Sequence, residues 1–307
     1  MPLVPIEQLT YYFPGFPDLV GRVAHSTMGE YQGDLQKYLT FCGWDPDRLL
    51  QPSTLRAWRR QMIEAGLAAA TINRRLAAIK SVLRSAVVHQ AVDLGTAYAL
   101  SLVENVRPQT LKERMRDERE ALTPEEVHRI FQVPNPLTLR GVRDRALIAT
   151  LAASGCRVSE VVGLRRTDVY WRGAKGTIAV RGKNQVYPRH APLTQKAYTW
   201  LQRWLERRAH LGMDVEIIFT RFLGRGPAPS SKPMTANGAY TIVKECAALA
   251  GLPAVSPHDF RRFVATHLYE SYGLLVAQRA LGHKRPETTM AYIRKHTDME
   301  GLTEPFA

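Results

Sequence analysis

Residues 281–292 read LGHKRPETTMAY, and this stretch is the most specific signal in the chain. Two shorter segments carry related chemistry: residues 155–160 read GCRVSE, and residues 258–262 read HDFRR. Together they supply arginine forks that fit phosphate oxygens, histidines that exchange protons near neutral pH and a tyrosine hydroxyl that can act as a covalent nucleophile. In a basic chain, this set predicts an enzyme that cuts and rejoins a nucleic-acid backbone through a phosphotyrosine bond.

The order and spacing of these segments resemble the tyrosine recombinase, or phage integrase, family. The resemblance runs from about Met28 to Tyr292 and is densest after Leu122. Neither Arg-x-Ser-Glu nor His-x-x-Arg is specific alone, whereas Leu-Gly-His followed by Thr-Thr-x-x-Tyr, nine residues from histidine to tyrosine, is specific. The resemblance implies a site-specific DNA recombinase that works as a homo-tetramer on double-stranded DNA, with no metal, cofactor or small-molecule substrate.

The composition independently favours a nucleic-acid partner. The chain has 307 residues, a net charge of +14 and an isoelectric point of about 9.9, and such an excess suits a polyanion. A membrane-surface protein would carry a basic amphipathic segment or a lipidation signal, and the sequence shows neither. The three cysteines are far apart and form no disulfide framework or metal pair, so we expect a cytoplasmic, nucleoid-associated protein.

We expect a mainly α-helical fold with a small β-sheet (α+β), divided into two domains. Residues 1–25 are rich in proline and aromatic residues and predict an irregular arm. Residues 26–103 show helical spacing and resemble the helical core-binding (SAM-like) domain of the family. Residues 104–120 predict a linker, and residues 121–307 predict the catalytic domain. The resemblance implies that the two domains form a clamp around DNA.

The last helix of the first domain carries charge on the face opposite its apolar stripe. A charged face is usually only solvated, but these charges are nearly all positive, which favours contact with DNA phosphates. The candidates on this face are Arg74, Arg75, Lys80 and Arg84. Further candidates for DNA contact in the second domain are Arg181, Arg189 and Arg262.

Local signals predict where helices of the second domain begin and end. Thr123 followed by Pro124 predicts a capped helix start. Gly155 and Gly282 predict helix ends or tight turns, and Thr288 predicts the N-cap of the last helix. Strands are expected on both sides of a turn at residues 182–184.

Arg157 and Glu160 are three residues apart and share a face if their segment is helical. By themselves they are most simply a surface ion pair, but the resemblance implies that Arg157 holds the scissile phosphate and Glu160 braces it. Lys183 stands at the tip of the predicted hairpin, where most lysines are only exposed turn residues. The resemblance makes it the acid that protonates the leaving oxygen. Pro188 implies an edge strand or a bulge, which leaves the register of the hairpin open.

His258 and Arg261 form a second same-face pair, at the start of a helix whose N–H groups suit an anion. The resemblance implies that His258 is the base or proton relay and that Arg261 is a second arginine for the phosphate. It implies that His283 donates a hydrogen bond to a phosphate oxygen and that Tyr292 is the nucleophile.

Two other functions remain open from the sequence. A type IB topoisomerase-like enzyme shares this chemistry but rejoins the same strand, and the small first domain and the short tail after Tyr292 favour a recombinase. A DNA-binding regulator with a silent active site would lack a catalytic residue, and none is missing. The apolar spacing in residues 299–307 predicts a short helix that docks on its own domain or, with slight preference, on a neighbouring protomer.

Overall fold

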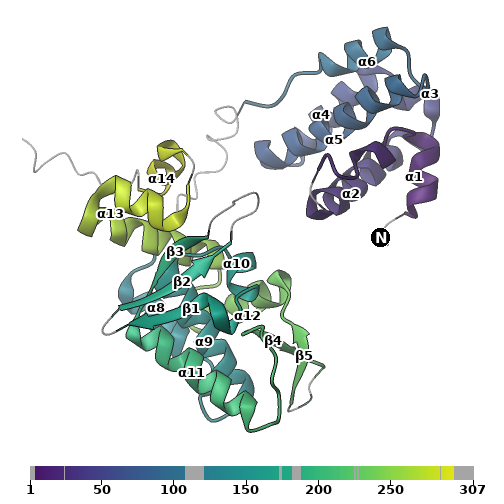
Figure 1. Ribbon diagram of the computed structural model, residues 1–307. Helices are drawn as coiled ribbons and strands as arrows, with labels where there is room; N and C mark the ends of the chain where they lie inside the picture. The colour runs from purple at the N-terminus through teal and green to yellow at the C-terminus, as the bar shows by residue number, and fades with distance from the viewer. Residues whose placement is uncertain are drawn as a thin grey trace, which may run out of the picture. The chain divides into compact units, whose positions relative to one another are not determined.

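The computed structural model divides the chain into two compact units, Met1–Glu118 and Arg119–Ala307. It describes residues 4–23, 25–107, 121–172, 175–181, 188–224, 226, 228–283 and 285–293. Both units are mainly helical, and the second also contains two small antiparallel sheets (Figure 1), which confirms the predicted fold class. Within the described ranges, every helix is too short or too polar to cross a bilayer.

The first unit consists of helices around an apolar core of its own. Prolines and capping aspartates start several of these helices: Pro46 and Pro52 occupy first helical positions, and Asp93 accepts a hydrogen bond from the Thr96 amide at 2.9 Å, as is typical of helix N-termini. The elements are α1 (Ile6–Tyr12), η1 (Pro17–Leu19), α2 (His25–Cys42), α3 (Pro46–Leu49), α4 (Pro52–Glu64), α5 (Ala69–Val88) and α6 (Leu94–Ser101).

The prediction of an irregular arm at residues 1–25 is wrong for the residues of α1 and η1. Pro5 is the N-cap of α1 and Pro17 is the first residue of η1, so these prolines begin helices. Four apolar side chains of this segment are at most 1% exposed and belong to the core of the first unit: Leu9, Phe13, Phe16 and Leu19. Burial of these side chains outweighs the weak helical pattern of the segment.

The predicted linker begins too early at residue 104. Val103 and Val106 are buried in the core of the first unit. The Asn73 side chain also donates a hydrogen bond to the Val106 carbonyl at 2.9 Å and accepts one from its amide at 2.7 Å. The chain is therefore held to the first unit through Val106, and residues 108–120 lie outside the described residues.

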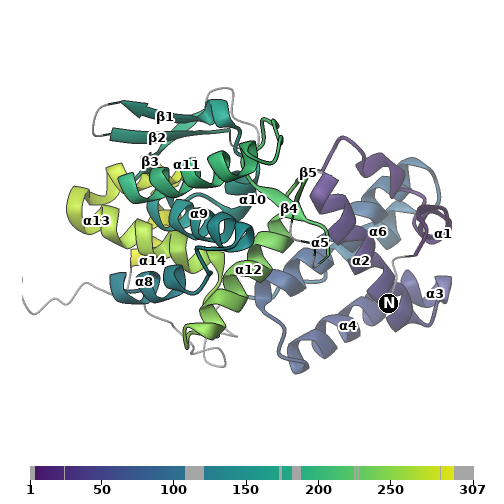
Figure 2. The ribbon, with the colours of Figure 1, turned by 90° about the horizontal axis from the view of Figure 1, so that it is seen from below.

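The second unit places a three-stranded sheet along one side of a group of helices, with α11 and α9 next to it (Figure 2). β2 is central and pairs antiparallel with β1 and β3, and Val180 lies opposite Arg189. The elements are α8 (Pro124–Gln132), α9 (Leu139–Ser154), α10 (Val158–Val162), η2 (Arg166–Asp168), β1 (Val169–Arg172), β2 (Lys175–Val180), β3 (Arg189–Leu193), α11 (Gln195–Ala209), β4 (Thr220–Phe222), β5 (Pro229–Pro233), α12 (Ala236–Leu249), α13 (Pro257–Leu281) and α14 (Pro286–Ile293).

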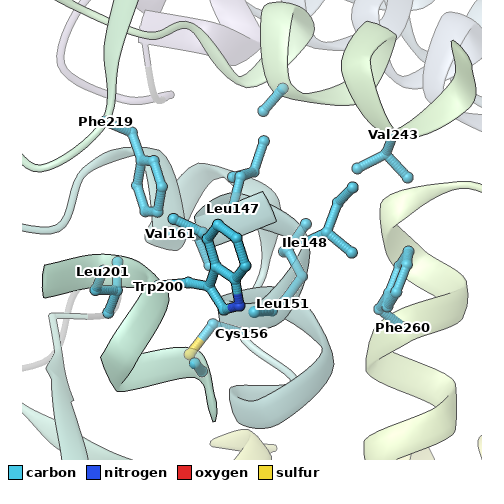
Figure 3. Packing of buried hydrophobic residues seen from close by; sticks show 14 of the residues in the cluster. Leu147, Ile148, Leu151, Cys156, Val161, Trp200, Leu201, Phe219, Val243 and Phe260 are labelled. Atoms are coloured by element: carbon cyan, nitrogen blue, oxygen red, sulfur yellow. The ribbon is translucent and has the colours of Figure 1, made fainter. Parts of the chain in front are cut away.

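Helix α9 runs through the core of the second unit. Its Leu147, Ile148 and Leu151 are fully buried, and Trp200 of α11 and Phe260 of α13 belong to the same apolar cluster (Figure 3). A fully buried large apolar side chain contributes about 1.5–3 kcal/mol relative to an exposed one. Burial of Phe260 therefore fixes the first turn of α13 on the core.

Several predicted helix ends are confirmed, and one is wrong. Thr123 caps α8 with a capping box and Pro124 follows at the first helical position. Gly155 and Gly282 are left-handed C-caps of α9 and α13. The last helix begins at Pro286, so Thr288 lies inside it and is not its N-cap, because proline at a first helical position is already set for helix entry. The turn predicted at residues 182–184 lies outside the described residues.

Candidate active site

The guanidinium of Arg261 lies at the centre of the site, only 1% exposed. Its Nη1 donates to the carbonyl oxygen of Gly155 at 2.7 Å. Its Nη2 donates to the carbonyl oxygen of Leu281 at 2.7 Å and lies 2.8 Å from Nε2 of His283. One buried cation thus joins the C-terminal ends of α9 and α13, and it is stable there because hydrogen-bond acceptors replace the lost water.

The two acceptor carbonyls belong to helix ends that only glycine can build here. Gly155 and Gly282 have φ of 59° and 69°, a left-handed conformation that is costly for other residues. A Cβ on Gly155 would lie 2.9 Å from Val264, and one on Gly282 would lie 2.5 Å from the Arg189 side chain. The predicted glycine turns therefore bring the carbonyls of residues 155 and 281 close to Arg261.

His283 follows α13 and is 7% exposed. Arginine can only donate, so the Nε2 atom facing Arg261 accepts, and the ring proton lies on Nδ1. Nδ1 then donates to Oγ1 of Thr289, 2.8 Å away and fully buried. Burial first, then the positive charges of Arg261, Arg157, Arg189 and His258, lower the pKa of His283 to about 4. The ring is neutral near pH 7 and its two nitrogens are engaged inside the protein.

Arg157 is the exposed cation of the site, with 52% of its side chain accessible. It precedes α10, and its Nη1 donates to Glu160 at 3.0 Å, while its amide donates to the same carboxylate at 2.7 Å. Arg189 of β3 also donates to Glu160, at 2.6 Å, and its other terminal nitrogen donates to the carbonyl oxygen of Ala280 at 2.6 Å. Burial opposes the charge of Glu160, but Arg189 and the bonds from Arg157 hold its pKa below the usual value.

His258 lies in the first turn of α13, one turn before Arg261. The residue has exposed surface, yet the protein around its ring removes enough water to lower its pKa, and the charges of Arg261, Arg262 and Arg157 act in the same direction. Tyr292 belongs to α14, and Lys183 lies outside the described residues. The structure therefore brings together Arg157, Glu160, His258, Arg261 and His283.

The residues expected to touch DNA differ in how far they reach solvent. Arg84 and Arg181 are exposed, and Arg262 is half-buried beside the site. Lys80 donates to the carbonyl of Val103. Arg189 is 9% exposed and bonded to Glu160. This contact makes it a brace between β3 and α10, a role the sequence did not suggest.

Arg74 and Arg75 share a buried carboxylate that the sequence pattern did not predict. Asp34 of α2 is 1% exposed, and its oxygens lie 2.6 Å from Nη1 of Arg74 and 3.4 Å from Nε of Arg75. Burial raises the pKa of Asp34, while the charges of Arg74, Lys37 and Arg75 act to lower it. The two arginines therefore hold α5 to α2, because an unpaired buried carboxylate would be costly. Their long separation from Asp34 in sequence hid this pairing.

Among the described residues, no group of three or more histidine, cysteine, aspartate or glutamate side chains is arranged to hold a metal ion. The ionisable groups that meet at the site include arginines, histidines and the carboxylates of Glu160 and Asp259.

Two family models match the chain: "Phage integrase family" at residues 120–299 and "Phage integrase, N-terminal SAM-like domain" at residues 19–90. The chain belongs to the phage integrase family. The curated relatives of this phage integrase family member include tyrosine recombinase XerD of Chlorobaculum tepidum, 31% identical over 95% of this chain and 92% of that protein. Another is tyrosine recombinase XerC of Mycobacterium sp. (strain KMS), 33% identical over 89% of this chain and 88% of that protein. The predicted family and enzyme class, tyrosine recombinase, are confirmed.

Solved structures of similar fold include a lambda integrase dimer bound to a COC′ core site, with a TM-score of 0.68 and 15% identity over 94% of this chain and 77% of that one. The Tn1549 transposon integrase in complex with circular intermediate DNA has a TM-score of 0.66 and 19% identity over 96% of this chain and 98% of that one. At these identities the likeness concerns the fold alone, and it agrees with the helical first unit and mixed second unit described above.

The pKa of His283 predicts a loss of stability in acid. Between the usual value of 6.5 and about 4, the unfolded chain binds a proton that the folded chain does not, so the free energy of unfolding falls as pH decreases through this window. From about pH 7 to about pH 5 the loss is about 2 kcal/mol from this residue. Urea unfolding at both pH values should show it, and His283→Gln should remove about that much of the pH dependence. An unchanged pH dependence in the variant would show that His283 is not its source.

Proposed function

We propose that this chain cuts and rejoins double-stranded DNA at specific sites through a 3′-phosphotyrosyl bond to Tyr292. The observation that carries the proposal is the cluster in which buried Arg261 and His283 lie beside the exposed Arg157. It concentrates positive charge with one carboxylate, Glu160, bonded inside it. A site of this kind stabilises the extra negative charge of a phosphate under attack.

The arginines are proposed to have different roles because they differ in solvent exposure. Arg157 has the accessible fork and would bind two oxygens of the scissile phosphate directly, while Glu160 and Arg189 keep it in place. Arg261 is buried and would act on the same phosphate from the ends of α9 and α13. His283 accepts from Arg261 in the DNA-free structure, so we assign it first to holding that guanidinium, rather than to the phosphate contact expected from the sequence.

The reaction begins when the phenolic oxygen of Tyr292 attacks phosphorus. A free phenol has a pKa of about 10, so a base must take its proton as the new oxygen–phosphorus bond forms. His258 is the candidate, because its lowered pKa keeps the ring neutral and able to accept a proton near pH 7. The bond to the 5′ oxygen breaks, and Lys183 would supply the proton that the departing oxygen needs.

The covalent intermediate keeps the energy of the broken bond, because one phosphodiester replaces another. Attack by a 5′ hydroxyl of the partner strand reverses the steps and releases Tyr292, so the cycle needs no ATP. We propose that it also needs no metal, because the arginine cations supply the electrostatic stabilisation that a metal would give. We place this reaction on DNA in the cytoplasm, in a tetramer of the chain. A solved lambda integrase tetramer is bound to a Holliday junction, which supports this arrangement.

Replacing Tyr292 with phenylalanine tests the nucleophile. Tyr292→Phe removes one hydroxyl, so DNA binding should stay near that of the unchanged protein while the covalent protein–DNA adduct disappears. Denaturing gels with DNA from the chain's own genomic neighbourhood would measure the adduct. Tyr272→Phe, the same change at a residue 67% exposed, is the control and should form normal adduct. Adduct formation by Tyr292→Phe would rule out this nucleophile.

The leaving-group acid can be tested by changing the leaving atom. Lys183→Ala should slow cleavage of ordinary DNA by roughly 10²–10⁴-fold, the usual effect of losing a general acid. DNA with sulfur in place of the 5′ bridging oxygen has a leaving group that needs no proton, so it should restore the rate. Lys232→Ala, at an exposed lysine, is the control. Equally slow cleavage of both substrates by Lys183→Ala would assign Lys183 another role.

A further inference from the structure

Thr289 has an environment that its neighbours in α14 do not share. It is fully buried, whereas Glu287 and Thr288 are exposed. Its Oγ1 lies 2.8 Å from Nδ1 of His283, which is also buried. A buried hydroxyl and a buried ring nitrogen each need a partner, and here they satisfy one another.

The direction of this hydrogen bond follows from the contact on the other ring nitrogen. Nη2 of Arg261 lies 2.8 Å from Nε2 of His283, and a guanidinium has no acceptor. Nε2 must therefore present its lone pair, and the proton of the neutral ring lies on Nδ1. Only an acceptor at Nδ1 is compatible with that tautomer, and Oγ1 of Thr289 is placed to be this acceptor.

The contact also links the helix of the proposed nucleophile to the arginine cluster. Thr289 stands three residues before Tyr292 in α14, close to one helical turn. From Thr289 the hydrogen bonds continue through His283 to Arg261 and on to the carbonyl of Gly155. Gly155 is two residues before Arg157. The hydrogen bonds therefore link α14, the helix of the proposed nucleophile, to the segment that carries the proposed phosphate-binding arginine.

We infer that Thr289 is a positioning residue for DNA cleavage: its hydroxyl fixes His283 in the tautomer that holds Arg261, and it thereby sets α14 against the phosphate site. The inference rests on the proposed function, because it concerns the same cleavage step. It adds a residue whose side chain touches neither the phosphate nor the leaving group. Loss of the hydroxyl would remove the acceptor that Thr289 gives to the buried Nδ1–H group, which is costly.

The test compares three substitutions on the full chain. Thr289→Val removes the hydroxyl and keeps the shape, and it should slow adduct formation roughly 10- to 100-fold, the rate equivalent of one lost hydrogen bond to a buried group. Its DNA affinity should change by less than about threefold, which is under 1 kcal/mol. Thr289→Ser restores a hydroxyl and should return most of the rate. Thr288→Val makes the same change one residue earlier, at an exposed position, and should be near the unchanged protein.

A second readout follows the ring itself and needs no DNA. Nitrogen NMR of protein with ¹⁵N-labelled histidine should show His283 protonated on Nδ1 and unprotonated on Nε2. The signal is assigned by its loss in His283→Gln. Thr289→Val should lose this single tautomer, and Thr289→Ser should keep it.

Two results would overturn the inference: an unchanged adduct rate in Thr289→Val, or a slower rate with unchanged His283 nitrogen signals. The second result would mean that Thr289 acts only in packing. Failure of the unchanged protein to form any adduct would instead count against the proposed function. The nitrogen signals of the DNA-free protein would still decide whether Thr289 sets the tautomer of His283.

Discussion

The second unit depends on placing one arginine where water cannot reach it. Arg261 is almost completely buried, and the carbonyls of Gly155 and Leu281 and the ring of His283 accept its hydrogen bonds. A buried cation without such partners would be strongly destabilising. The chain must therefore end two helices at glycine, start α13 on the apolar core through Phe260, and keep His283 neutral, all within one small region.

This constraint explains the electrostatics around it. Arg157, Arg189 and Arg261 lie close together, and Glu160 is bonded to the first two. Burial lowers the pKa of His283 and of His258, and repulsion from the neighbouring positive charges lowers both further. A phosphate that enters beside Arg157 would relieve this repulsion, so the same arrangement that strains the DNA-free site favours its proposed ligand.

The sequence predicted those features that depend on local chemistry. Helix ends at Gly155 and Gly282, the capping box at Thr123 and the helix start before His258 follow from neighbouring residues, and the structure contains them. Contacts between distant segments were missed. Asp34 pairs with Arg74 across 40 residues and Arg189 with Glu160 across 29, so basic residues that looked free for DNA proved to be braces. The arm before α2 was misread because its prolines begin helices, and only tertiary burial shows that.

The most direct test of the central role of Arg261 is the rate of covalent adduct formation by Arg261→Lys on a single DNA substrate. Lysine keeps the charge but cannot reproduce a planar fork that bonds to several fixed acceptors. We predict a loss of at least ~10²-fold, the effect of removing a preorganised electrostatic contact, while Arg207→Lys, the same change at an exposed position of α11, stays near the unchanged rate. Adduct formation by Arg261→Lys at the rate of the unchanged protein would contradict the account.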